Sequence, residues 1–131
     1  MSDSAAPARA PSTTTDRSAI KKTLRDRARA MVPLLRARSD EAAQLHHLPV
    51  ATVREMIEAG FFKILQPAAH GGLELDPEDF FEVQITLAEG CMSTAWVLGV
   101  VAIHNWQLAL FDARAQQDVW GEDDNTLISS S

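Results

Sequence analysis

The sequence predicts an all-α fold, and three observations lead to this prediction. Apolar residues recur at helical spacing through most of the chain, which is typical of helices with one buried face. Residues that favour helix starts and helix ends separate these segments. Strand-like composition is confined to the short run Thr126-Leu127-Ile128. The chain has 131 residues, 46% of them hydrophobic, which suffices for one domain with a core.

Residues 1–17 are rich in Ser, Thr, Ala and Pro and have few large apolar side chains. Such a segment cannot offset the entropy of ordering, so we expect a disordered tail. Ser18 is the expected cap of a first helix that runs to about His46, and Pro33 should kink or divide it. The apolar stripe of this helix is formed by Ile20, Leu24, Met31 and Leu35.

Pro49 is expected near the first position of a second helix, because its fixed φ suits a helix start. Gly60 is the expected stop just beyond that helix. The run Phe61 to Leu65 then forms an apolar connector. The stretch QPAAHGG, from Gln66 to Gly72, is predicted to be a turn-rich loop.

Asp76 and Pro77 are a favourable cap and first residue for a third helix that extends to about Glu89. Ser93 or Thr94 is expected to cap a fourth helix, which carries the most apolar stretch of the chain.

A short fifth helix spans residues 113–120. We therefore expect a helical domain over residues 18–121 and the start of a truncated middle β-domain over residues 122–131. A strand needs partners, so the chain is expected to be the amino-terminal portion of a longer protein. Ten apolar residues are predicted to serve packing only: Leu24, Met31, Leu35, Val53, Ile57, Phe61, Phe62, Phe80, Leu87 and Val97.

Charge is distributed unevenly along the chain. Residues 1–38 carry nine Lys/Arg against three Asp, and the remainder carries three basic and fifteen acidic residues. The basic part lacks aromatic residues, so a solvated helix face is favoured over a nucleic-acid or membrane surface. Cys91 is the only cysteine, which excludes an intrachain disulfide and favours a reducing, cytoplasmic compartment. No secretory signal or membrane span is expected.

The fourth helix contains the candidate site. With about 100° per residue, Trp96, Val100, His104, Gln107 and Phe111 fall on one stripe. The rest of the circumference is aliphatic, so we expect this helix to be enclosed on most sides. The pattern alone favours a core histidine bonded to a backbone carbonyl over a functional one. The four histidines lack ligand spacing and no Cys pair exists, so no metal site is expected.

Three stretches together resemble a known family: GFFKILQPAAHGGLELDPEDFFE, LAEGCMSTAWVLGVVAIHNWQLALF and AQQDVWGEDDNTLISSS. Over about residues 18–131 the chain is similar to the acyl-CoA dehydrogenase superfamily. More narrowly, it resembles the oxygenase components of two-component flavin-dependent aromatic monooxygenases. Within these it looks nearest to hydroxylases of 3-hydroxy-9,10-secoandrosta-triene-dione, followed by p-hydroxyphenylacetate hydroxylases.

This resemblance implies the amino-terminal helical domain of the acyl-CoA dehydrogenase fold, ending in the first strand of a missing β-domain. It implies reduced flavin (FMNH2 or FADH2) from a separate flavin reductase, O2, and a phenolic substrate hydroxylated at the ortho carbon. It also implies a homotetramer when the protein is complete, and an inactive fragment otherwise. By similarity, Trp96 lines the flavin pocket, His104 lies near the phenol as a catalytic base, and Ser130 contacts flavin and substrate.

Two other classes stay open at this point. One is an acyl-CoA dehydrogenase proper, which would use a catalytic carboxylate from a later bundle. The other is a non-catalytic helical interaction module from a truncated gene.

Overall fold

The computed structural model describes residues 14–129. Residues 1–13 of the expected tail, together with Ser130 and Ser131, lie outside the described residues. Within 14–129 the chain forms only helices and loops, which confirms the all-α prediction. The elements are α1 (Thr14–Leu45), α2 (Val50–Glu58), the 3-10 helices η1 (Phe61–Lys63) and η2 (Ala68–His70), α3 (Pro77–Gly90), α4 (Met92–Ala109) and α5 (Ala113–Trp120).

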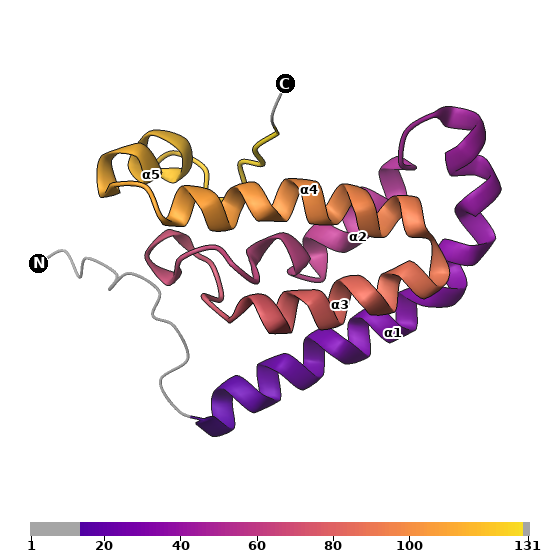
Figure 1. Ribbon diagram of the computed structural model, residues 1–131, viewed down its shortest axis with the longest axis horizontal. Coiled ribbons are helices and arrows are strands. Elements are labelled where there is room, and N and C mark those ends of the chain that lie inside the picture. Colours follow the sequence, from indigo (N-terminus) through magenta and orange to yellow (C-terminus); the bar gives the residue numbers. More distant parts are fainter. Residues whose placement is uncertain (1–13, 130–131) are drawn as a thin grey trace, which may run out of the picture.

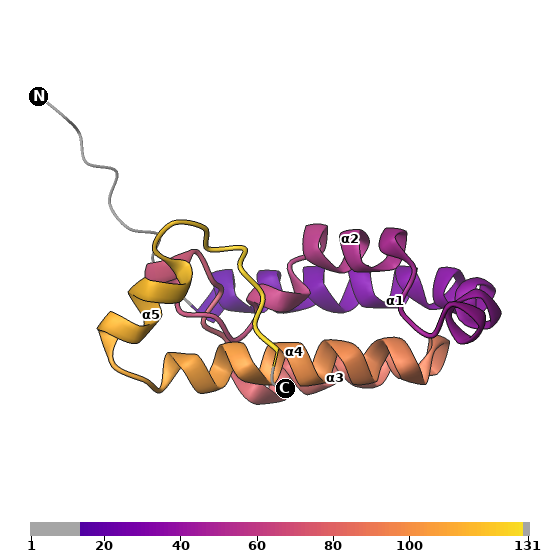
Figure 2. The same cartoon turned by 90° about the horizontal axis from the view of Figure 1, so that it is seen from above.

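The helices are arranged in two layers (Figures 1 and 2). Helices α1 and α2 form one layer, and α3 and α4 lie side by side in the other. Helix α3 runs parallel to the first half of α1, and α4 returns antiparallel to α3. The core lies between the layers, where its largest fully buried apolar side chains are Phe61, Phe80, Leu35, Met56, Ile64, Leu87 and Leu98.

Helix α1 starts earlier than the sequence suggested. Its described part begins at Thr14, so Ser18 lies inside the helix and residues 14–17 of the expected tail are helical. Pro33 lies inside α1 and does not divide it. The ribbon changes direction in the second half of the helix, as a proline within a helix predicts (Figure 1).

The boundaries of α2 and α3 follow the sequence signals closely. Pro49 is the N-cap of α2, and Gly60 follows its end in the left-handed region at φ 85°. Asp76 caps α3 with Pro77 as the first residue, and the Asp79 carboxylate accepts a hydrogen bond from the Asp76 N–H at 3.0 Å. The first N–H groups and last C=O groups of a helix have no hydrogen-bond partner within it. Cap residues supply such partners or end the helix, and for this reason they define where α2 and α3 begin and end.

The junction between α3 and α4 differs from the prediction. Cys91, with extended backbone at φ −159°, ends α3 and also caps α4. Its N–H donates to Leu87 O at 3.0 Å, and its carbonyl accepts from Ala95 N at 3.2 Å. The predicted caps, Ser93 and Thr94, therefore lie inside α4, because one residue is enough to turn the chain between the two helices.

Residues 121–129 form no strand, contrary to the prediction for Thr126-Leu127-Ile128. Strand propensity reflects packing and pairing within a sheet, and residues 14–129 contain no strand to pair with this run. Two residues expected only to pack are partly exposed instead, Ile57 at 42% and Val97 at 37%. Both line shallow hollows at the surface, Ile57 beside Leu48 and Val97 beside His46, so they are covered only in part.

The uneven charge distribution leads to ion pairs between α1 and α3. Basic residues one turn apart on α1 face acidic residues on the parallel helix α3. Their ion pairs are Arg17–Asp76 at 3.8 Å, Lys21–Asp79 at 3.2 Å, Arg25–Glu82 at 3.4 Å and Arg29–Glu89 at 2.8 Å. Each such surface pair contributes about 0–1 kcal/mol, but the series favours this register of α1 on α3. No helix within residues 14–129 is long and apolar enough to cross a membrane.

Candidate functional site

Helix α4 is buried on one side only. Its inner side packs against α3 and η1 and consists of Thr94, Ala95, Leu98, Ala102, Asn105 and Leu108. Its outer side exposes large apolar residues, together with those that follow its end: Met92, Trp96, Val97, Val100, Ile103, Trp106, Leu110 and Phe111. We call this second set the outer face of α4. The expectation that α4 is enclosed on most sides is therefore wrong for this chain.

The physical reason lies in the number of neighbours. A helix that is apolar all round is normally buried all round, but only one layer of this domain lies against α4 (Figure 2). An exposed apolar surface of this extent is typical of an interaction surface or a ligand site.

Trp96 dominates the outer face, with 69% of its surface exposed. It borders a shallow hollow of about 260 Å³ between α3 and α4. Gly99 forms part of the floor, and Phe81 on α3 and Ile103 on α4 line the walls. A flat indole beside an apolar hollow is suited to contact a planar aromatic ligand.

His104 lies two turns beyond Trp96 on the same helix and is half-buried. Its Nδ1 lies 2.5 Å from the carbonyl oxygen of Val100. A carbonyl only accepts hydrogen bonds, so Nδ1 carries a hydrogen, and in the tautomer with a single N–H the lone pair lies on Nε2. The contact to a backbone carbonyl is the one expected of a core histidine, but His104 is only half-buried. Nε2 is the ring nitrogen that could accept a proton from a ligand.

The structure does not bring all the predicted site residues into one cavity. The hollow beside Trp96 is lined by residues of α3 and α4 that do not include His104. Both side chains belong to the outer side of α4, but this chain alone does not enclose a space between them. Ser130, the third predicted site residue, lies outside the described residues.

Asn105 is a buried polar residue that the sequence analysis did not single out. Its side chain is fully buried, and Nδ2 donates to the carbonyl of Phe62 at 2.8 Å. Its Oδ1 has no hydrogen-bond partner among the described residues. The bond ties α4 to η1 and thereby fixes the rotation of α4 next to His104. An amide within an otherwise apolar inner face was the available signal for this role.

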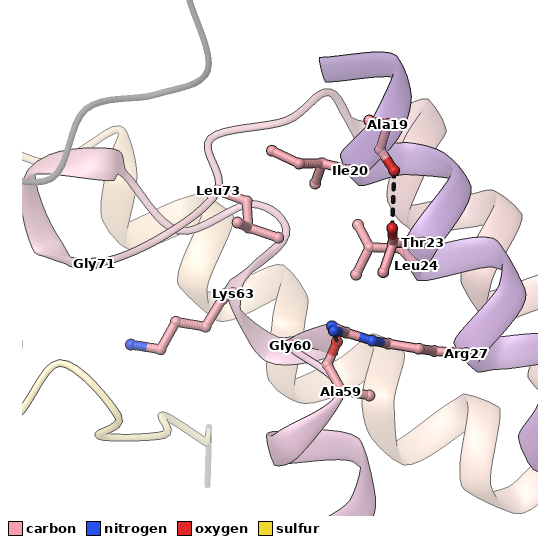
Figure 3. A pocket seen from close by; sticks show the side chains of 10 residues that line it. All are labelled: Ala19, Ile20, Thr23, Leu24, Arg27, Ala59, Gly60, Lys63, Gly71 and Leu73. Carbon is pink, nitrogen blue, oxygen red and sulfur yellow. Dashed lines mark hydrogen bonds between the residues drawn. The ribbon is translucent and has the colours of Figure 1, made fainter. Parts of the chain in front are cut away.

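A larger hollow of about 370 Å³ lies elsewhere, between α1 and the chain from Ala59 to Leu73 (Figure 3). Its wall on α1 includes Arg27, whose Nη1 donates to Ala59 O at 3.0 Å. On the opposite side Lys63 extends away from Arg27. No residue of α4 lines this hollow, so it is separate from the Trp96 surface.

Comparison with known proteins agrees with this architecture. Residues 14–123 match the family described as "Acyl-CoA dehydrogenase, N-terminal domain". The chain belongs to this family.

Similar proteins specify the branch. Over 101 residues the chain is 50% identical to "Flavin-dependent monooxygenase, oxygenase subunit HsaA" of Mycobacterium tuberculosis, which covers 77% of this chain and 26% of that protein. It is 32% identical to "p-hydroxyphenylacetate 3-hydroxylase, oxygenase component" of Acinetobacter baumannii, over 77% of this chain and 24% of that protein. The chain thus spans about a quarter of the length of the curated relatives it matches.

Solved structures give the same picture. A crystal structure of the HsaA monooxygenase from M. tuberculosis superposes with a TM-score of 0.81 at 46% identity, covering 85% of this chain and 29% of that one. The structure of XiaF from Streptomyces sp., in complex with FADH2 and glycerol, superposes with a TM-score of 0.76 at 28% identity, covering 86% and 29%.

Proposed function

We propose that this chain is the amino-terminal helical domain of the oxygenase component of a two-component flavin-dependent monooxygenase. The complete protein would hydroxylate a phenol at the ortho carbon with O2 and reduced flavin. The similarity to several oxygenase components supports this proposal. The observation that carries it is the outer face of α4, which exposes the indole of Trp96, with the half-buried imidazole of His104 two turns further along the same helix.

The residues on this face fit a flavin. The isoalloxazine ring system is aromatic and apolar at its dimethylbenzene edge, and the exposed indole of Trp96 beside an apolar hollow offers a matching surface. One structural neighbour, XiaF, is described as a complex with FADH2. When bound, reduced flavin would supply the two electrons that activate O2, and one oxygen atom of O2 would be transferred to the substrate while the other leaves as water. Trp96 would hold the ring in place, and Ser130 would contact the ring edge and the substrate.

His104 would act on the substrate. A phenol becomes a better nucleophile at its ortho carbon as its hydroxyl loses the proton. The bond from Nδ1–H to Val100 O leaves Nε2 of the neutral ring as the proton acceptor. The apolar residues on either side of the ring on the outer face would exclude water once the surface is covered.

Further parts of the proposal concern the complete protein. A separate flavin reductase would deliver FMNH2 or FADH2, in keeping with relatives described as oxygenase components. The complete protein would be a homotetramer in the cytoplasm, and a steroid-derived phenol is the substrate class that the HsaA similarity favours. The 131-residue chain alone would bind flavin poorly and turn nothing over, because α4 is covered on one side only.

A second candidate is an acyl-CoA dehydrogenase proper, which the family description favours. The two functions differ in what they do to flavin. A monooxygenase consumes O2 with reduced flavin and a phenol, whereas a dehydrogenase reduces bound flavin with an acyl-CoA thioester.

The deciding experiment uses the complete natural protein that contains this chain, supplied with NADH and a flavin reductase. We expect phenol-dependent O2 uptake with formation of a catechol, and no bleaching of oxidised flavin by acyl-CoA thioesters. The opposite pair of results would identify a dehydrogenase.

The role of His104 is tested in the same protein by His104→Ala, with His47→Ala as an exposed control. We expect hydroxylation to slow by about 10²–10⁴-fold, the usual contribution of a general base, and one ionisation to disappear from the pH profile. An unchanged rate and pH profile would rule out the base.

A further inference from the structure

The hollow beside Trp96 is lined mainly by apolar side chains of the neighbouring helices α3 and α4. It is bordered by Phe80 and Phe81 of α3 and by Val100 and Ile103 of α4. Among residues 14–129, no charged side chain lines it. Its volume of about 260 Å³ exceeds the roughly 150 Å³ that is enough for one benzene ring in a protein cavity. The hollow therefore has room for the edge of an aromatic ring system.

Gln84 of α3 also lines this hollow, and its carboxamide is held against α4. Its Nε2 donates to Ala95 O at 3.0 Å, next to the residue that carries the exposed indole. A backbone carbonyl only accepts hydrogen bonds, so the amide nitrogen is the atom that meets Ala95. The side chain that could otherwise fill the hollow is thus tied to its floor.

Gly99 provides the space that this carboxamide occupies. A Cβ built on Gly99 would overlap Gln84 Nε2 and would lie 3.7 Å from Oε1. Gly99 lies inside α4, where glycine is less favourable than alanine. A side chain at this position would push the carboxamide away from Ala95 and outward, toward the hollow. The glycine therefore keeps the hollow open, at a cost in helix stability.

We infer that the hollow receives the edge of the flavin ring that carries two methyl groups, and that Gly99 is the residue that determines this specificity. This inference rests on the proposed function. The opposite, pyrimidine end of the ring carries C=O and N–H groups, which need hydrogen-bond partners when they leave water. The hollow offers one carboxamide, and its nitrogen already donates within the fold. The methyl-bearing edge needs no such partner and is stabilised by contact with apolar residues.

The test measures the affinity of the complete protein for reduced flavin, by anaerobic titration followed through tryptophan fluorescence. FMNH2 and FADH2 are titrated first, and the one that binds more tightly is compared with its analogue in which hydrogen replaces both methyl groups of the benzene ring. Burial of two methyl groups corresponds to about tenfold in affinity. We therefore expect the unmodified protein to bind the natural flavin about tenfold more tightly than the analogue.

Three variants then test the role of the glycine. In Gly99→Ala the preference for the natural flavin should fall below about threefold, because the displaced carboxamide occupies the place of the methyl groups. Gln84→Ala is the matched control: it removes the bond to Ala95 but leaves the hollow open, so we expect the preference to stay. The double variant Gln84→Ala/Gly99→Ala has no carboxamide to displace and should regain most of the preference. Urea midpoints measured in parallel establish that each variant is folded.

The inference is overturned if the unmodified protein binds both flavins equally well, or if Gly99→Ala keeps the full preference for the natural flavin. Both outcomes are independent of the proposed reaction, because flavin affinity is measured without a phenol and without O2. Failure to hydroxylate any phenol, together with a preference that is lost in Gly99→Ala and regained in the double variant, would reject the reaction and keep the assignment of the hollow.

Discussion

Replacing Gly90 by alanine tests how closely α3 approaches α1. Gly90 is the last residue of α3, next to the turn into α4. A Cβ built on it would lie 2.8 Å from Val32 O and 2.9 Å from the Cβ of Leu35, both on α1. Carbon atoms in ordinary contact are about 3.5–4.0 Å apart, so the two helices would have to separate by about 0.6 Å or more.

The expected cost follows from two opposing effects. Inserting a methyl group into a packed contact costs about 1–3 kcal/mol. Alanine gains up to about 1 kcal/mol over glycine inside a helix, and less at its last residue. We therefore expect Gly90→Ala to lower the free energy of unfolding by about 1–2 kcal/mol. For a domain of this size that corresponds to a Tm about 4–8 °C lower.

The assay is urea denaturation of the 131-residue chain followed by far-UV circular dichroism, with thermal melts in parallel. Gly99→Ala is the control, because the atoms nearest its Cβ belong to the amide end of the Gln84 side chain. The loss of the hydrogen bond from this amide to Ala95 O would be offset by the better helix propensity of alanine. We expect Gly99→Ala to be near neutral. If Gly90→Ala were as stable as the unmodified chain, the close approach of α1 and α3 at this point would be wrong.

Two further predictions concern polar contacts. Hydrogen bonds from Arg38, at 2.7 and 3.0 Å, lower the pKa of Glu55, while burial acts in the opposite direction. The stabilisation is therefore complete above the unfolded pKa of about 4.3 and is lost as pH falls through the lower folded value. Urea midpoints of the unmodified chain and of Glu55→Gln should differ at pH 7 and converge in acid, and a constant difference would contradict this linkage. Asn105→Ala should lower the free energy of unfolding by about 1–3 kcal/mol in the same assay, because the Phe62 carbonyl loses its buried donor; an unchanged midpoint would show that this bond is not needed.

Local signals in the sequence were sufficient for most of the helix ends. Asp76 with Pro77, and Gly60 after α2, each satisfy or terminate backbone hydrogen bonding within a few residues. The helical conformation of residues 14–18 and the cap at Cys91 were not predicted. Local preferences at both places are weak compared with tertiary packing, which a single sequence does not reveal.

The candidate site was predictable only in part. The angular spacing predicted Trp96 and His104 on one stripe of α4; in the structure Trp96 is exposed, whereas His104 is half-buried and does not line the hollow beside Trp96. The spacing does not predict which side of α4 is buried, because this helix has apolar residues all round and could pack on any side. The hydrogen bonds from Lys63 and Gln66 to Asp124 could not be predicted either. They join segments about sixty residues apart, and no periodicity in the sequence links the two segments.

Charged and apolar residues of this domain differ in how well the domain itself pairs or covers them. Most of the basic residues of α1 form ion pairs, four of them with acidic residues of α3 or its cap. The outer face of α4 has no such partner among the described residues, and it includes a tryptophan with 69% of its surface exposed. A side chain of this size in water is costly to keep unless something binds it. The surface that the fold leaves unused is therefore the surface on which flavin binding should be sought first.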